Sequence, residues 1–346
     1  MSSARACRTP STTALQRRGD GTVLRLILLR VLQAIPLILL STVVIFIAVS
    51  VAGDPLDQYR KPNVPQSTLD AKAAELGLDR PLYERYWDWI SGAVQGDLGR
   101  NLRGDEVTTM LAERSLVSFR LIALAVVIAV VVALAVGFYS AVHRGSRRDR
   151  VLMGLTVVFL TVPEFWLAVV LKQGGIIFNR ETGSKFIATV GDSTPGIDSA
   201  GLGERLSDYA GHLVLPTIVL VLACYPIWAM YQRTAMLEVL DTDYIRLARA
   251  KGLPKNTVLV RHGLRTALTP VVTMIALRLP WIIGGLVVVE TVFGWRGLGQ
   301  MLVEGIQRQD TNTVLGFLLF SAILITLLNL LADILYGYLD PRVRDD

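Results

Sequence analysis

The sequence contains few of the residue types from which catalytic and metal sites are built. Its 346 residues include two cysteines, Cys7 and Cys224, and three histidines, at positions 143, 212 and 262. Two isolated cysteines do not form a disulfide framework. Neither the HExxH pattern of zinc enzymes nor the GxSxG pattern of serine hydrolases occurs. We therefore expect a non-catalytic chain with no metal site and no cofactor of its own.

The chain also lacks any Gly-Lys dipeptide. The GxxxxGK[ST] loop, whose backbone N–H groups hold the phosphates of ATP, requires that dipeptide. Any ATP hydrolysis that drives this chain must therefore take place on another subunit.

Charged residues are scarce and hydrophobic residues abundant. The charged fraction is 18%, the hydrophobic fraction is 52% and the mean hydropathy is +0.48, which leaves too little polar surface to cover a soluble fold. A helix crosses about 30 Å of hydrocarbon with about 20 apolar residues. We expect an all-α integral membrane protein with six transmembrane helices, at Val31–Val51, Leu121–Ala141, Val151–Leu171, Leu213–Tyr231, Val271–Thr291 and Val314–Tyr336.

Basic residues flank these segments unevenly, and cytoplasmic flanks carry an excess of them. This bias places both termini in the cytoplasm. The net charge of +6 then anchors the chain at the membrane surface and does not indicate nucleic-acid binding. The basic residues concerned lie beside alternate ends of the spans: Arg17, Arg18, Arg25, Arg30, Arg144, Arg147, Arg148, Arg150, those of the segment 233–265, Arg342 and Arg344.

The segments outside the spans differ in character. Residues 1–28 are polar and without apolar periodicity, which predicts a disordered cytoplasmic tail, and residues 29–346 form the transmembrane domain. The stretch 174–211 is polar and rich in glycine, and its pattern predicts an external loop of unassigned structure.

The predicted external loop 52–115 contains a helical pattern that begins near Pro81. Three aromatic residues, Tyr86, Trp87 and Trp89, lie in this pattern. They suit the water–lipid interface, where aromatic side chains gather, and stacking on a peptide is the alternative.

The segment between the fourth and fifth spans carries the signals of a helical hairpin. Asp243 suits the cap of a first helix, Gly252 the left-handed residue that ends it, and Pro254 the first turn of the next. Ala248 and Ala250 are small enough for another protein to approach closely. A basic helix held by anionic lipid and a DNA-reading helix-turn-helix are alternatives, and the position between two spans disfavours the second.

This hairpin resembles the coupling loop, or EAA loop, of permease subunits in ABC importers, where a glycine follows six residues after the first motif residue, as Gly252 follows Arg246. The strings ARAKGL and RHGLRTALTPVV are similar to the oligopeptide and dipeptide permeases, and so are ETVFGWRGLGQ from Glu290 and the ending NLLADILYGYLDPRVR. The chain departs from the general family pattern at two places. From position 262 it reads His-Gly-Leu-Arg where the general family has Ile-x-Leu-Pro, and Arg296 stands where the family usually has proline.

The resemblance implies the type I ABC importer permease fold, a peptide pathway and a bacterial plasma-membrane location. It also implies a homologous second permease as heterodimer partner, two cytoplasmic ATPase subunits that bind ATP and Mg²⁺, and an external substrate-binding protein. The coupling loop would be 241–265, with contacts to the ATPase from Arg246, Ala248, Arg249, Ala250, Lys251, Gly252 and Leu253. Permeases for nickel chelates or glutathione-like cargo are alternatives. A self-contained secondary transporter is another, although no internal repeat of the kind common in such carriers is visible.

Ionisable residues within predicted spans are costly in lipid unless they face protein or water, so they indicate candidates for the translocation pathway. Glu164 is the first, because it follows Pro163, which kinks the third span and frees a backbone carbonyl. Its alternative is a pair with an arginine of the partner. Arg278 is the second, with snorkelling or pairing within the subunit as the alternative. The candidate pathway residues are Pro163, Glu164, Trp166, Arg278, Trp281 and Glu290.

The predicted orientation can be tested with engineered cysteines and a membrane-impermeant thiol reagent in intact cells. We expect Asp105→Cys, in the external loop, to be labelled and Ser146→Cys, in the basic connector after the second span, to be protected. Labelling of Ser146→Cys, or protection of Asp105→Cys, would contradict the assignment.

Overall fold

The computed structural model describes residues 12–53, 56, 59–60, 64–75, 77–183 and 186–339. These residues form helices and connecting loops, with β structure confined to one isolated bridge between Arg100 and Glu106, so the predicted all-α fold is confirmed. The elements are α1 (Thr12–Ala52), α2 (Gln66–Glu75), α3 (Leu82–Val94), α4 (Val107–Val142), α5 (Arg147–Thr161), α6 (Glu164–Thr182), η2 (Ile197–Ser199), α7 (Leu202–Leu240), α8 (Asp243–Ala250), η3 (Thr257–Leu264), α9 (Arg265–Phe293), α10 (Leu298–Gln307) and α11 (Thr311–Leu339).

The predicted third span is two helices. Five of the six predicted spans fall within single helices, α1, α4, α7, α9 and α11, whereas α5 and α6 meet at an angle of 104°. Pro163 lacks an N–H group and disfavours helical backbone at the residue before it, and Val162 is extended, with φ −74° and ψ 126°. Among the described residues, five helices are long and apolar enough to cross a membrane, and the number rises to six if this bent pair is counted as one span.

The N-terminal tail is a second correction. Residues 1–11 lie outside the described residues, but α1 already begins at Thr12, so the disorder predicted for residues 1–28 is wrong beyond that point. Extending an existing apolar helix by one residue costs far less than nucleating a new one. The sequence of residues 12–28 therefore continues the helix of the first span.

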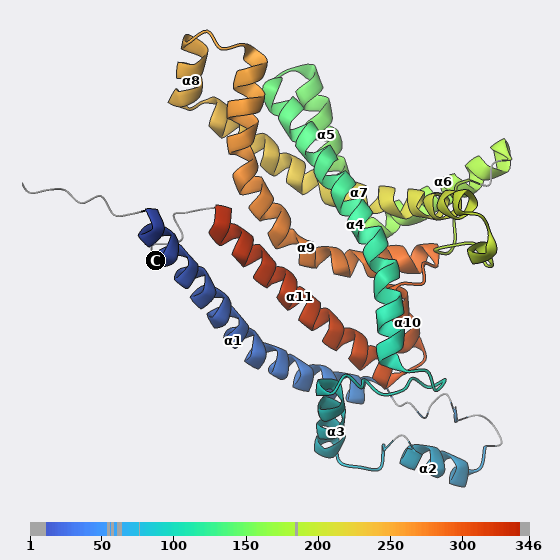
Figure 1. Cartoon of the computed structure of the whole chain (residues 1–346). Helices are drawn as coiled ribbons and strands as arrows, with labels where there is room; N and C mark the ends of the chain where they lie inside the picture. The colour runs from blue at the N-terminus through green and yellow to red at the C-terminus, as the bar shows by residue number, and fades with distance from the viewer. Residues whose placement is uncertain are drawn as a thin grey trace, which may run out of the picture.

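The packing of α4 against α7 forms the centre of the molecule (Figure 1). Small buried residues recur every four positions on one face of α4, at Ala125, Ala129, Ala133 and Gly137. Ala129 and Ala133 pack with Trp228 and Ala229 of α7 in one apolar cluster. Lipid gives little hydrophobic drive for helix association, so close contact between backbones supplies much of the stability.

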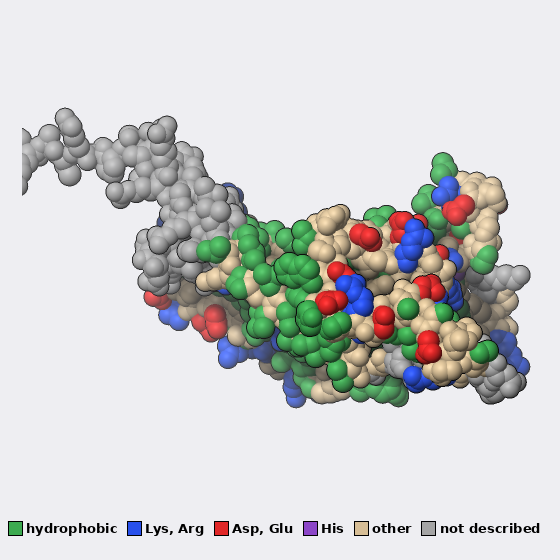
Figure 2. Space-filling model, turned by 90° about the horizontal axis from the view of Figure 1, so that it is seen from below, with side chains coloured by type: hydrophobic (Ala, Val, Ile, Leu, Met, Phe, Trp, Pro, Cys, Tyr) green, Lys and Arg blue, Asp and Glu red, His purple; other side chains and the backbone are tan. Residues whose placement is uncertain are grey.

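The helices α1 and α11 form a second pair beside this centre (Figure 1). An ion pair between Arg30 and Asp333, with an N–O distance of 3.2 Å, joins the start of the apolar part of α1 to the last turns of α11. Figure 2 shows the molecule from below, relative to the view of Figure 1. On this side, hydrophobic side chains gather over a broad area beside an area that is rich in charged groups. An exposed apolar area of this kind suits contact with lipid or with another protein.

The hairpin helix α8 and the helices α2 and α3 lie at opposite ends of the molecule (Figure 1), here named the α8 end and the α3 end. The predicted helix after Pro81 is α3. Two of the three aromatic residues noted in the sequence pack against α1, where the rings of Tyr86 and Trp89 contact Phe46. The Tyr86 hydroxyl also lies 2.9 Å from Thr42 Oγ1. Trp87, by contrast, is exposed. Of these three aromatic residues, Trp87 is the one whose side chain is exposed to lipid or to a ligand.

The polar stretch 174–211, unassigned from the sequence, consists of the end of α6, a loop and the first turns of α7. The loop is fixed to the end of α9, because Gly191 N–H donates to Phe293 O at 2.8 Å and Arg296 Nε donates to Asp192 Oδ1 at 2.9 Å. The Asp192 carboxylate also raises the pKa of Arg296. The arginine that replaces the family's proline thus holds this loop in place.

Gly137→Ala tests the seam between α4 and α7. A Cβ at position 137 would lie 2.6 Å from Ala229 O and 2.7 Å from Gln232 Cβ, so we expect overpacking to destabilise the fold by about 1–3 kcal/mol. Gly154→Ala is the matched control, because a Cβ there meets nothing within 4 Å and alanine favours the helix. Thermal unfolding in detergent should show a lower midpoint for Gly137→Ala alone, and equal midpoints would show that the helices do not pack this closely.

Candidate functional site

The hairpin at the α8 end has the turn that the sequence predicts. Gly252 adopts a left-handed conformation with φ 75°. Its N–H donates to Arg249 O at 3.0 Å, and the N–H of Leu253 donates to Ala248 O at 3.4 Å, which together form a Schellman motif. After Pro254 the chain continues through the π-helical segment η3 directly into α9. The hairpin is therefore joined to a spanning helix without a loop between them.

Two details of the predicted hairpin are corrected. Thr242, not Asp243, occupies the cap position, and Asp243 is the first helical residue, where it pairs with Arg246 at 3.2 Å. Ala248 does not face a partner, because it is buried with Ile245 and lies against η3. Positions 245 and 248 are three apart, so they share the helix face that packs inward.

The outward face of the hairpin combines apolar and basic groups. Leu247 is 56% exposed and Leu253 is 40% exposed, and exposed basic residues lie near both of them along the chain. Exposed apolar groups surrounded by charge mark surfaces that contact another protein. Of the residues predicted to contact an ATPase, those exposed on this face are Arg246, Arg249, Ala250, Lys251, Gly252 and Leu253.

A pocket of about 290 Å³ lies where α6 meets α7 and α9, just after the bend between α5 and α6. It brings together three of the predicted pathway residues, Glu164, Arg278 and Trp281. The Arg278 guanidinium lies 5.9 Å from the centre of the Trp281 ring, close enough for a cation–π contact. The pocket therefore offers one carboxylate, one guanidinium and the indole rings of Trp281 and Trp228.

The carboxylate of Glu164 is held tightly against α9. A Cβ at Gly285 would lie 2.5 Å from Glu164 Oε2, so only glycine leaves room for this carboxylate. Glu164 Oε1 is buried and has no hydrogen-bond partner among the described residues. A buried carboxylate oxygen without a partner is costly, and a ligand that donates a hydrogen bond would remove that cost.

The other predicted pathway residues lie elsewhere. Pro163 is exposed at the bend and Trp166 is 52% exposed, and neither lines this pocket. Glu290 is fully buried, so its placement on the pathway is corrected. Its carboxylate accepts hydrogen bonds from Ser118 Oγ at 2.5 Å and from Gly299 N at 2.6 Å, which ties α9 to α4 and α10.

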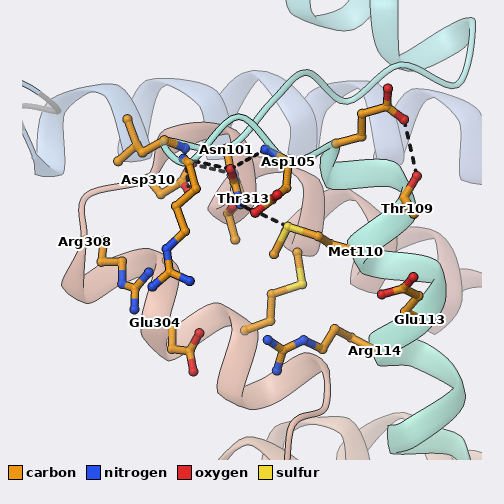
Figure 3. Close-up of a pocket in the computed structure, with 15 residues that line it drawn as sticks. Asn101, Asp105, Thr109, Met110, Glu113, Arg114, Glu304, Arg308, Asp310 and Thr313 are labelled. Carbon is orange, nitrogen blue, oxygen red and sulfur yellow. Dashed lines mark hydrogen bonds between the residues drawn. The ribbon is translucent and has the colours of Figure 1, made fainter.

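A charged cleft of about 530 Å³ at the α3 end was not predicted from the sequence (Figure 3). Its walls are the loop that precedes α4, the first turns of α4, and α10 with the turn into α11. Sequence patterns could not reveal it, because its two halves lie about two hundred positions apart in the chain. Its charged side chains include Arg103, Glu113, Arg114, Glu304 and Arg308.

Comparison with known proteins identifies the family. The family described as the inner membrane component of binding-protein-dependent transport systems matches residues 129–345, and the N-terminal domain of these membrane components matches residues 23–105. The chain belongs to this family. It is therefore a membrane component of a transport system, as the motifs predicted.

The chain is similar over its length to several named permeases. It is 40% identical over 317 residues to the oligopeptide transport system permease protein OppB of Mycobacterium tuberculosis, which covers 91% of this chain and 97% of that protein. It is 33% identical over 321 residues to the oligopeptide permease AppB of Bacillus subtilis, with coverages of 92% and 99%. It is 34% identical over 324 residues to the glutathione transport system permease protein GsiC of Escherichia coli, with coverages of 93% and 99%. The predicted resemblance to the oligopeptide branch is confirmed.

Proposed function

We propose that this chain is the membrane-spanning subunit of an ATP-driven importer for short peptides. The hairpin carries the proposal, because it presents an apolar and basic face at one end of the molecule and continues without a loop into a spanning helix. The cargo is inferred from the relatives, of which two are named as oligopeptide permeases and one as a glutathione permease. Glutathione is itself a small peptide, so a glutathione-like cargo remains the second candidate.

The other subunits follow from the same proposal. Two cytoplasmic ATPases would bind ATP and Mg²⁺, a homologous permease would complete the pathway, and an external binding protein would deliver the peptide. The α8 end would face the cytoplasm with both termini, and the α3 end would face the outside of the plasma membrane. A self-contained transporter is disfavoured, because the family consists of components of binding-protein-dependent systems.

The hairpin is built to transmit movement. Ile245 and Ala248 pack on Val258 of η3 and against the end of α7, so α8 cannot rotate independently of them. A displacement of α8 by an ATPase would therefore reach α9 directly, and α9 carries Arg278 and Trp281 of the pocket. Rigid-body shifts of packed helices of this kind are a common route between two conformations.

The pocket at the bend is the proposed polar part of the peptide pathway. Glu164 would attract the ammonium groups of a peptide, and Trp281 with Arg278 would contact its apolar and acidic parts. The unpartnered oxygen of Glu164 supports this role, since a passing N–H donor would satisfy it.

Gly252→Asp tests the coupling role. Left-handed backbone costs a residue with a Cβ about 1 kcal/mol or more, and the new carboxylate would also add negative charge to a basic face. We expect a complex that assembles in the membrane but shows weaker ATPase association, or loses stimulation of ATP hydrolysis by the loaded binding protein, and imports no peptide. Gly183→Asp is the matched control, because Gly183 is also a left-handed glycine that ends a helix in open space. Normal uptake by Gly252→Asp at normal expression would contradict the coupling role.

Glu164→Gln tests the pocket. A carboxylate acts on charge and an amide of the same shape does not, so uptake of cationic peptides should fall more than uptake of neutral ones. Competition uptake with a matched cationic and neutral peptide measures this ratio. Glu181→Gln, near the other end of α6 and exposed, should leave the ratio unchanged. An equal loss for both peptides in Glu164→Gln would assign Glu164 a structural role.

A further inference from the structure

Three guanidinium groups line the cleft at the α3 end, and one of them, Arg114, also acts electrostatically on the buried carboxylate of Glu290. The three are those of Arg103, Arg114 and Arg308, and none of them forms an ion pair among the described residues. Arg308 and Arg114 approach from opposite sides, with Glu304 near the floor of the space (Figure 3). The Nη1 atom of Arg114 is buried and has no hydrogen-bond partner in the described part of the chain. Buried donors are nearly always paired in native proteins, so this atom points to a missing acceptor.

The walls of the cleft, by contrast, are held by contacts within the chain. Asp310 accepts hydrogen bonds from the N–H groups of Leu102 and Thr313, each at 3.2 Å. Asp105 accepts one from Asn101 Nδ2 at 3.0 Å. These bonds fix the loop before α4 against the turn between α10 and α11. The cleft is therefore formed before any ligand arrives, which lowers the entropic cost of binding.

The charges of the cleft suit a ligand that carries both signs. Besides the three arginines, Glu113 and Glu304 line the space and also form no ion pair among the described residues. A guanidinium binds a carboxylate through two parallel hydrogen bonds, and a carboxylate binds an ammonium group. A short peptide with free termini supplies one of each.

The size of the cleft agrees with such a ligand. Pockets that bind small molecules usually measure about 300–1,000 Å³, and this one measures about 530 Å³. A surface that docks a folded protein is broader and flatter. The cleft is also separated along the chain from the pocket of Glu164, since the two share no lining residue.

We propose that this cleft is a peptide-binding site that receives the C-terminal carboxylate on Arg308 and Arg114 and the peptide ammonium on Glu113 and Glu304. This inference rests on the proposed function. In the proposed orientation the cleft lies outside the membrane, so a peptide would bind there before it reaches the pocket at the bend. Selection for a free carboxylate would then be a property of the permease in addition to any selection by the binding protein.

The test compares uptake of one neutral tripeptide with uptake of its C-terminal amide. The complete importer, with its ATPases and its binding protein, is reconstituted in proteoliposomes with this chain either unchanged or as Arg308→Gln. We expect Arg308→Gln to reduce the acid-to-amide uptake ratio about tenfold, the size of one lost charge-assisted hydrogen bond. The binding protein is the same in both preparations, so a change in this ratio belongs to the permease.

Arg80→Gln is the matched control, because Arg80 is a partly exposed arginine at the same end that pairs with Glu84 and Asp88 on α3 and lies outside the cleft. Its ratio should equal that of the unchanged chain. An unchanged ratio in Arg308→Gln overturns the proposal. An equal fall in acid and amide uptake also overturns it and assigns Arg308 to the docking of an external protein. If the unchanged importer takes up neither peptide, the proposed function itself fails, and this inference fails with it.

Discussion

The contact between α4 and α7 is the interaction on which the rest of the structure depends. Of the spanning helices, α7 is the one that packs against α4, α5, α6 and α9. Residues of α7 contribute to four of the apolar clusters, the one beneath the hairpin included. The seam works because Gly137 and the alanines before it let the α4 backbone approach α7. In lipid this closeness replaces the hydrophobic drive that would associate such helices in water.

Buried polar groups fix the two ends of α4. Near the α8 end, Asp149 of α5 accepts hydrogen bonds from Ser140 of α4 and from Arg233 of α7, the latter at 3.0 Å. Near the other end, Ser118 of α4 donates to Glu290 of α9. Breaking a buried pair of this kind costs more than the pair contributes, because it leaves an unpaired group away from water. These bonds therefore set which helices are neighbours, while the apolar seam supplies the attraction.

The helix α9, with η3 before it and α10 after it, connects the three places where function is proposed. The segment η3 with α9 begins in the hairpin, carries Arg278 and Trp281 of the pocket, and has Glu290 near its end, where the Glu290 carboxylate holds the first turn of α10. Glu304 in α10, and Arg308 directly after it, line the cleft. Movement of the hairpin would thus reach both proposed peptide sites through continuous, packed elements. This continuity is the physical basis that we propose for coupling.

The sequence alone determined the features that have local causes. The all-helical fold and five of the spans follow from long apolar runs, because a backbone in lipid must satisfy its hydrogen bonds within the helix. The turn at Gly252 also follows, since glycine adopts left-handed backbone without the steric cost of a Cβ. Tertiary packing decided the rest. The sequence indicated a kink at Pro163 but not its angle of 104°, and it did not show that η3 covers Ala248. The burial of Glu290 and the cleft of Arg308 depend on contacts such as those of Glu290 with Ser118, 172 positions away, and of Asp310 with Leu102, 208 positions away, and partners that distant leave no trace in local pattern.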